Sequence, residues 1–140
     1  MATHLKFGCI SLVVILFGLL PLNVFAGEVL DAPPDQSDPS VKFLFNMHGR
    51  HVERHGADGD YEYSEILNAL AKKGLVVIGE VRSDIDRSDY SKRIAGQVGR
   101  LLDERVTAEN ITAAGYSKGA FKSMLIASRV QNEAVKYGIL

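Results

Sequence analysis

Apolar and polar positions along residues 41–140 alternate between two periods, which predict strands and helices in turn. Short apolar runs predict strands at residues 41–47, 75–81, 111–116 and 135–140. Apolar side chains three or four positions apart predict helices at residues 63–74, 94–102 and 118–130. Because strands and helices alternate, we expect an α/β fold, a three-layer sandwich around a small, mostly parallel sheet. Functional sites of such sheets lie at the carboxyl ends of the strands.

The predicted helices differ in how far their apolar surface extends around the helix. The helix at residues 63–74 is amphipathic, whereas the one at residues 118–130 is apolar on nearly every side. A helix of the second kind is usually buried. We therefore expect Phe121 and Met124 to belong to the core.

Three polar segments are expected to lie outside the regular elements. Residues 27–40 contain three prolines and four acidic residues, which predicts a disordered tether without packed structure. Residues 48–60 contain three glycines, which predicts a loop. Residues 82–89 predict a charged loop in which Ser88 or Asp89 caps the following helix.

The first 26 residues have the layout of a removable signal peptide. A short polar start with Lys6 precedes an apolar run of about 14 residues, which is shorter than the roughly 20 that a membrane-spanning helix needs. Small residues ending in Ala26 offer a cleavage site. We expect cleavage after Ala26 and an exported, periplasmic or extracellular protein with no stable membrane span. An uncleaved signal that anchors the chain is the alternative.

Composition and charge exclude several classes of protein. With 46% hydrophobic and 24% charged residues, the chain is typical of a globular protein, and its 140 residues allow one domain, at residues 41–140. The net charge of −1 provides no basic excess for a phosphate backbone, so nucleic-acid binding is disfavoured. The only cysteine, Cys9, lies in the predicted signal, so the mature chain has no disulfide and no thiol nucleophile.

One motif in the predicted domain carries chemistry. Residues 115–119 read Gly-Tyr-Ser-Lys-Gly and match the G-x-S-x-G nucleophile elbow, with a predicted strand before them and a predicted helix after them. In such an elbow, Ser117 sits on a strained turn and the flanking glycines let the helix pack close to the neighbouring strand. The start of the helix and the Lys118 N–H favour a developing oxyanion. A plain glycine-rich turn with Ser117 as a helix cap is the alternative.

A second motif ends the first predicted strand. Residues 46–50 read Asn-Met-His-Gly-Arg, and a His-Gly pair at this position can direct a backbone N–H toward the same serine. Glycine allows the backbone to approach a substrate closely. The pair is unspecific by itself, but both motifs end strands of one predicted sheet.

Together these motifs resemble the amino-terminal part of the α/β-hydrolase fold, as found in small exported members with a strand that ends in His-Gly-Arg. The resemblance covers residues 41–140. It implies that Ser117 is the nucleophile, and that the backbone of Lys118 and of Gly49 or Arg50 supplies the oxyanion donors. It also implies a small ester or acyl substrate, no cofactor, and a sheet in which the first predicted strand lies between the second and third.

The chain departs from the family after the elbow. In this fold the catalytic acid and histidine follow the serine along the chain, yet neither Asp nor His follows Ser117, and Glu133 is the only acidic residue there. We therefore expect an incomplete serine hydrolase that shows no turnover by itself. An apolar last strand also favours self-association. A non-catalytic or degenerate binding protein on the same fold is the alternative.

Three histidines, His48, His51 and His55, lie in or beside the predicted loop at residues 48–60. One of them could replace the missing base if it came within hydrogen-bond reach of Ser117, and His48 is the best placed. The three could also bind a metal, but their spacing matches no standard metal motif and the glycines favour a loop. We expect a solvated loop, with neither metal nor cofactor.

The remaining charged residues suggest two further sites. Arg50 and Arg54 could orient an anionic substrate, although solvation at the surface is the simpler interpretation. Asp84, Asp86 and Asp89 could suggest calcium, but the glycine and the closing glutamate of a calcium loop are absent. We interpret these aspartates as a charged loop.

Overall fold

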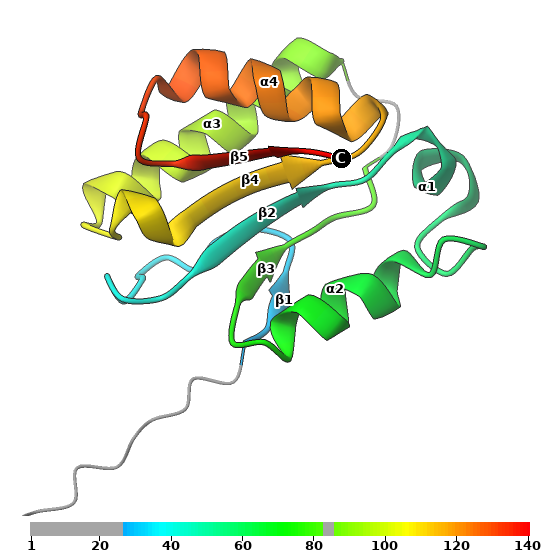
Figure 1. Cartoon of the computed structure of the whole chain (residues 1–140), viewed down its shortest axis with the longest axis horizontal. Helices are drawn as coiled ribbons and strands as arrows, with labels where there is room; N and C mark the ends of the chain where they lie inside the picture. Colours follow the sequence, from blue (N-terminus) through cyan, green and yellow to red (C-terminus); the bar gives the residue numbers. More distant parts are fainter. Residues whose placement is uncertain (1–26, 83–85) are drawn as a thin grey trace, which may run out of the picture.

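A five-stranded, all-parallel sheet forms the centre of the molecule, with strand order β1-β3-β2-β4-β5 (Figure 1). The computed structural model describes residues 27–82 and 86–140, so the predicted signal and Asp84 lie outside the described residues. The strands are β1 (Val29–Leu30), β2 (Phe43–Met47), β3 (Val76–Ile78), β4 (Ile111–Gly115) and β5 (Lys136–Ile139). The α/β sandwich predicted from the sequence is confirmed.

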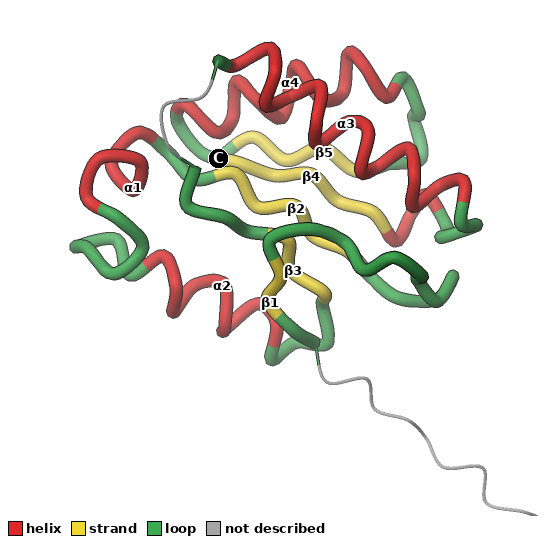
Figure 2. Tube along the Cα trace, turned by 180° about the vertical axis from the view of Figure 1, so that it is seen from behind, coloured by secondary structure: helices red, strands yellow, loops and turns green. Residues whose placement is uncertain are grey.

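Helices cover the two faces of the sheet unequally. The helices are α1 (Arg50–His55), α2 (Tyr63–Ala71), α3 (Arg87–Asp103) and α4 (Lys118–Val130), with a 3₁₀ turn at Ala108–Asn110. The long helices α3 and α4 lie together on one face, and α2 lies on the other face beside β1 and β3 (Figures 1 and 2). Within residues 27–82 and 86–140, every helix is too short or too polar to span a bilayer.

Alternation along the central strands divides the core into two layers. Phe43, Phe45 and Met47 of β2 pack with α3 and α4, as do Val76 and Ile78 of β3. The intervening Val77 instead packs with Val52, Tyr63, Leu67 and Ala71 in the α2 layer. Both faces of β3 are therefore covered, as its continuous apolar run predicts. Strand β2 lies between β3 and β4, as the resemblance to the α/β-hydrolase fold implies.

The segment at residues 27–40, predicted to be a disordered tether, is instead packed. Its strand β1 pairs with β3 through Val29 and Leu30. The Arg100 guanidinium on α3 then donates hydrogen bonds to the carbonyls of Pro33 (2.8 Å) and Pro34 (2.9 Å). Prolines lack an N–H but keep their carbonyl acceptors, so a distant arginine can hold a segment whose composition predicts no structure.

Two other sequence predictions are wrong in detail. The predicted loop at residues 48–60 contains helix α1, which places His51 and His55 on a helix. The cap of α3 is Asp86, whose side chain accepts from the N–H groups of Ser88 (2.7 Å) and Asp89 (3.2 Å). Ser88 and Asp89, which the sequence suggested as caps, therefore donate the capped N–H groups, and the capping side chain is that of Asp86.

Candidate functional site

Ser117 sits at the turn between β4 and α4 in a strained backbone conformation, with φ 54° and ψ −120°. Positive φ is unfavourable for any residue with a Cβ and costs roughly 1–3 kcal/mol. Ser117 occupies the N-cap position of α4, but its side chain makes no capping hydrogen bond. The geometry is thus that of a strained strand-to-helix turn, and the hydroxyl does not serve to cap the helix.

Close backbone packing at two glycines holds this turn in place. A Cβ on Gly119 would overlap the carbonyl oxygen of Met47 and lie 2.9 Å from that of His48. A Cβ on Gly115 would lie 2.5 Å from the carbonyl carbon of Gly119. The missing side chains let the start of α4 rest on the end of β2.

The two sequence motifs therefore meet in space. Met47 and Gly115 are register partners at the carboxyl ends of β2 and β4. Gly49 packs against the ring of Tyr116, so a Cβ on Gly49 would lie 2.8 Å from the ring atom Cε2. The structure thereby brings the His-Gly-Arg end of β2 beside the serine turn, as carboxyl ends of parallel strands require.

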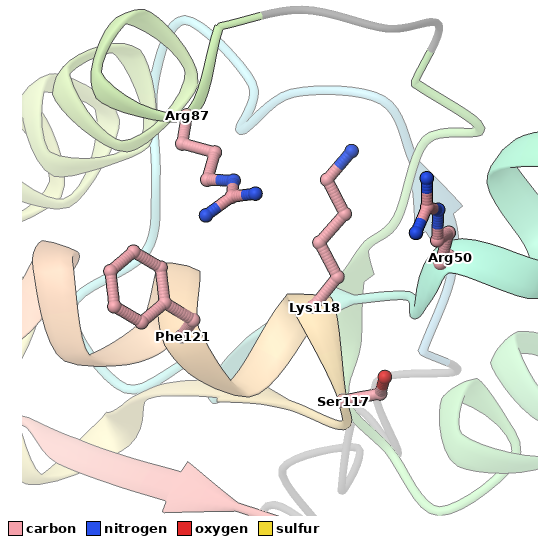
Figure 3. Close-up of a pocket in the computed structure, with 5 residues that line it drawn as sticks. All are labelled: Arg50, Arg87, Ser117, Lys118 and Phe121. Carbon is pink, nitrogen blue, oxygen red and sulfur yellow. The ribbon is translucent and has the colours of Figure 1, made fainter.

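A pocket of about 580 Å³ opens beside Ser117. Its lining comes from the first residues of three helices, Arg50, Arg87 and Lys118, together with Ser117 and Phe121. Figure 3 shows the three cationic side chains reaching toward the space above Ser117. The Arg87 guanidinium lies 5.7 Å from the centroid of the Phe121 ring, and Lys118 Nζ lies 2.7 Å from Glu53 Oε1.

His48 is buried and both of its ring nitrogens are engaged. The backbone N–H of Arg82 donates to Nε2 at 3.1 Å, so Nδ1 carries the proton and donates to the Gly49 carbonyl at 2.9 Å. Burial is the main cause that lowers the pKa of His48 to about 4. Because both nitrogens of this neutral imidazole are hydrogen-bonded to backbone groups, His48 holds the loop after β2 in place. It is not available to accept a proton from Ser117.

Two further cations are buried, and one of them, Lys122, lies close enough to Lys118 and Arg87 for their charges to interact. Arg82 and Lys122 are almost fully buried, and both sit over the ring of Tyr90, at 5.2 Å and 4.5 Å from its centroid. Arg82 also donates through Nη2 to the His48 carbonyl. Burial is the largest single influence on Glu53 and raises its pKa, but the hydrogen bond with Lys118 and the positive charges of Lys118, Lys122 and Arg82 together outweigh it. The pKa of Glu53 is therefore lowered and the carboxylate stays charged.

Comparison of the chain with protein-family models, with curated proteins and with solved structures gives no significant match. The structure itself shows a small parallel α/β fold. Membership of the α/β-hydrolase family remains a prediction that rests on the residues and their geometry.

The other residues singled out in the sequence lie apart from this pocket. The rings of His51 and His55 on α1 lie with their centroids 4.3 Å apart, tilted by 33°, and Arg54 is exposed on the same helix. In the described ranges, no three side chains of the metal-binding types gather closely enough to hold an ion. Asp86 is engaged as the cap of α3.

Sequence reasoning missed four charged residues at the site, namely Glu53, Arg82, Arg87 and Lys122. Two signals could have found part of this set. Lys122 lies three positions after Gly119, so a helix whose Gly119 packs against the neighbouring strand turns Lys122 inward as well. Arg82 and Arg87 follow β3, whose carboxyl end belongs to the edge where sites form. No local pattern indicates that Glu53 meets Lys118, since 65 positions separate them.

Proposed function

We propose that the chain is the nucleophile-bearing part of a serine hydrolase that acts on esters or related acyl compounds. The observation that carries the proposal is the strained backbone of Ser117 at the mouth of a pocket. A non-glycine residue persists at such angles only where the surroundings enforce them, and such strain clusters at functional sites. Export of the protein, expected from residues 1–26, belongs to the same proposal.

The chemistry follows from the position of Ser117. Its Oγ attacks the carbonyl carbon of the substrate, and the carbonyl oxygen becomes an oxyanion. The amides of Lys118 and of Gly49 or Arg50 are the proposed donors to this oxyanion, supported by the positive end of α4. When the intermediate collapses, the alcohol leaves and the acyl group stays on Ser117 until water removes it.

The serine proton needs a base, because a neutral serine hydroxyl is a weak nucleophile. His48 is already hydrogen-bonded on both nitrogens, and the sequence after Ser117 contains neither His nor Asp. We therefore predict that the purified chain hydrolyses p-nitrophenyl acetate no faster than its Ser117→Ala variant. Added imidazole, which can act as an external base, should produce a rate that depends on Ser117 and leave an acetyl group on the peptide containing it.

The Ser117→Ala variant corrects for hydrolysis by imidazole alone. Equal rates for both proteins at every imidazole concentration, with no acetyl group on Ser117, would contradict the hydrolase proposal. Serine-dependent turnover without imidazole would show that a base is present after all, and would overturn only the expectation that the chain lacks one.

A non-catalytic binding protein on the same fold is the second candidate. The observation that favours it is that His48 is neutral and hydrogen-bonded through both ring nitrogens, so it is not available to accept the Ser117 proton beside the cationic pocket. Ligand binding that Ser117→Ala leaves intact, combined with failure of the imidazole experiment, would favour this candidate.

A further inference from the structure

The charges that line the pocket beside Ser117 are of one sign. Arg50 and Arg87 are exposed at its wall and Lys118 lies between them (Figure 3). None of the described lining residues is acidic. Glu53 lies nearby, but it pairs with Lys118, and within the described ranges no carboxylate forms an ion pair with Arg50 or Arg87. Among the described residues, no carboxylate therefore neutralises the two guanidinium groups at this wall.

Two buried cations, Arg82 and Lys122, add further positive charge near the pocket, and the charge of Glu53 opposes it only in part. Lys122 Nζ, and Nε and Nη1 of Arg82, are buried and have no hydrogen-bond partner among the described residues. Burial and then the charge of Arg82 lower the pKa of Lys122 to about 8; Glu53 opposes this shift, and the charges of Lys118 and Arg87 add to it. Buried donors without acceptors are costly, so this region is favourable for negative charge.

The amino-terminal ends of α3 and α4 also contribute positive charge near the pocket, although unequally. Helices α3 and α4 begin at Arg87 and Lys118, and the amino-terminal end of a helix carries partial positive charge. The Asp86 side chain caps α3 and offsets its end. No side chain caps α4. The amino-terminal end of α4 therefore adds to the positive field at Ser117.

We propose that the pocket beside Ser117 binds a compact oxyanion, a carboxylate or phosphate group of its ligand, held by Arg50 and Arg87. A guanidinium presents paired donors that match either group. Phe121 supplies an apolar wall next to the anion, and about 580 Å³ leaves room for a small organic part as well. The inference rests on the proposed function only in taking the anion to be part of the substrate, since binding itself does not need Ser117.

Titration calorimetry of the purified chain with inorganic phosphate, and separately with acetate, tests the proposal. We expect saturable binding of at least one anion. Arg50→Gln and Arg87→Gln should each weaken it about tenfold or more, because a charge-assisted hydrogen bond is lost. Arg54→Gln is the matched control, from an exposed position on the same helix as Arg50, and should change binding less than about twofold.

The outcomes separate this proposal from the hydrolase. Tighter binding of phosphate than of acetate would identify a phosphate group, and the reverse would identify a carboxylate. Absence of saturable binding by either anion would overturn the proposal, as would equal weakening by all three arginine variants when each keeps the wild-type unfolding midpoint. Failure of the imidazole experiment leaves anion binding standing, because the proposed anion ligands are Arg50 and Arg87.

Discussion

At the elbow, the absence of a Cβ at the glycines is as important for the structure as the side chain of the serine. Gly119 has no Cβ, and this alone allows the first turn of α4 to lie against the Met47 carbonyl. Ser117 has a Cβ in a backbone region where one is unfavourable. The motif is thus a pair of glycines that permit close packing around a serine held under strain.

Gly119→Ala should lower the free energy of unfolding by about 3 kcal/mol, because the added methyl must displace backbone and not a flexible side chain. Gly96→Ala is the matched control. Gly96 lies inside α3, where an added Cβ meets nothing within 4 Å, so that variant should be more stable by about 0.5–1 kcal/mol. Urea unfolding of both variants checks the prediction. A Gly119→Ala protein as stable as the wild type would contradict it.

Helix α4 shows how one close contact sets the orientation of a whole element. The sequence predicted that Phe121 and Met124 belong to the core, yet they are 44% and 46% exposed. The buried side is formed by Gly119, Lys122, Ser123 and Ile126, which are spaced as one face of a helix. Once Gly119 is placed against β2, the helical period turns Lys122 and Ser123 inward and the two large apolar side chains outward. Ser123 Oγ then donates to the Ala113 carbonyl at 2.8 Å.

The inward-facing lysine makes stability depend on pH. The pKa of Lys122 is lowered from 10.5 to about 8 by burial first, and the charges of Arg82, Lys118 and Arg87 lower it further, with Glu53 opposing them. Below about pH 8, Lys122 is charged in the folded protein and lowers the free energy of unfolding by its full amount. As the pH rises from about 8 toward 10.5, this loss of stability disappears. The cost is about 3 kcal/mol, from 1.4 kcal/mol for each pKa unit.

Lys122→Met should therefore be more stable than the wild type at pH 7, and its advantage should shrink between pH 8 and pH 10. Lys92→Met, at an exposed position on α3, should follow the wild-type pH profile. Denaturant unfolding at a series of pH values measures both differences. A constant difference between Lys122→Met and wild type over this range would show that Lys122 does not titrate as expected.

At the scale of the whole molecule, the sheet is covered on one face and partly bare on the other. Helices α3 and α4 cover one face (Figure 2), while α2 lies beside β1 and β3. An apolar trough of about 500 Å³ lies between α2 and the strands β2 and β4, and Leu140 lines it at 84% exposure. Strand β5 forms one of the two edges of the sheet in the described chain, and its Ile139 is 60% exposed. This exposed edge supports the expectation that the last strand self-associates.

Ile139→Lys should shift the protein toward the monomer in analytical ultracentrifugation, because a charged side chain on an edge strand opposes strand pairing. Val81→Lys is the control, since it also removes an exposed apolar side chain but lies away from β5. If both variants associate as the wild type does, self-association through the last strand is wrong. If Val81→Lys is equally effective, the association is general apolar clustering and not strand pairing.

Local patterns in the sequence determined much of the fold. The strand and helix periods and the motif around Ser117 depend on side chains that are neighbours along the chain, so short-range spacing predicts them. The place of β2 between β3 and β4 is not local in this sense, and it was implied only by the resemblance to the α/β-hydrolase fold. The meeting of the two motifs followed as well, because carboxyl ends of parallel strands share one edge of a sheet.

Tertiary structure alone decided the rest, because these features depend on residues far apart in the sequence. The segment at residues 27–40 is held by Arg100 and β3, and the rotation of α4 is set by the end of β2. The pocket cations Arg50, Arg87 and Lys118 come from three helices that begin at the same edge of the sheet. Periodicity identifies each helix, but only packing brings their first residues around Ser117.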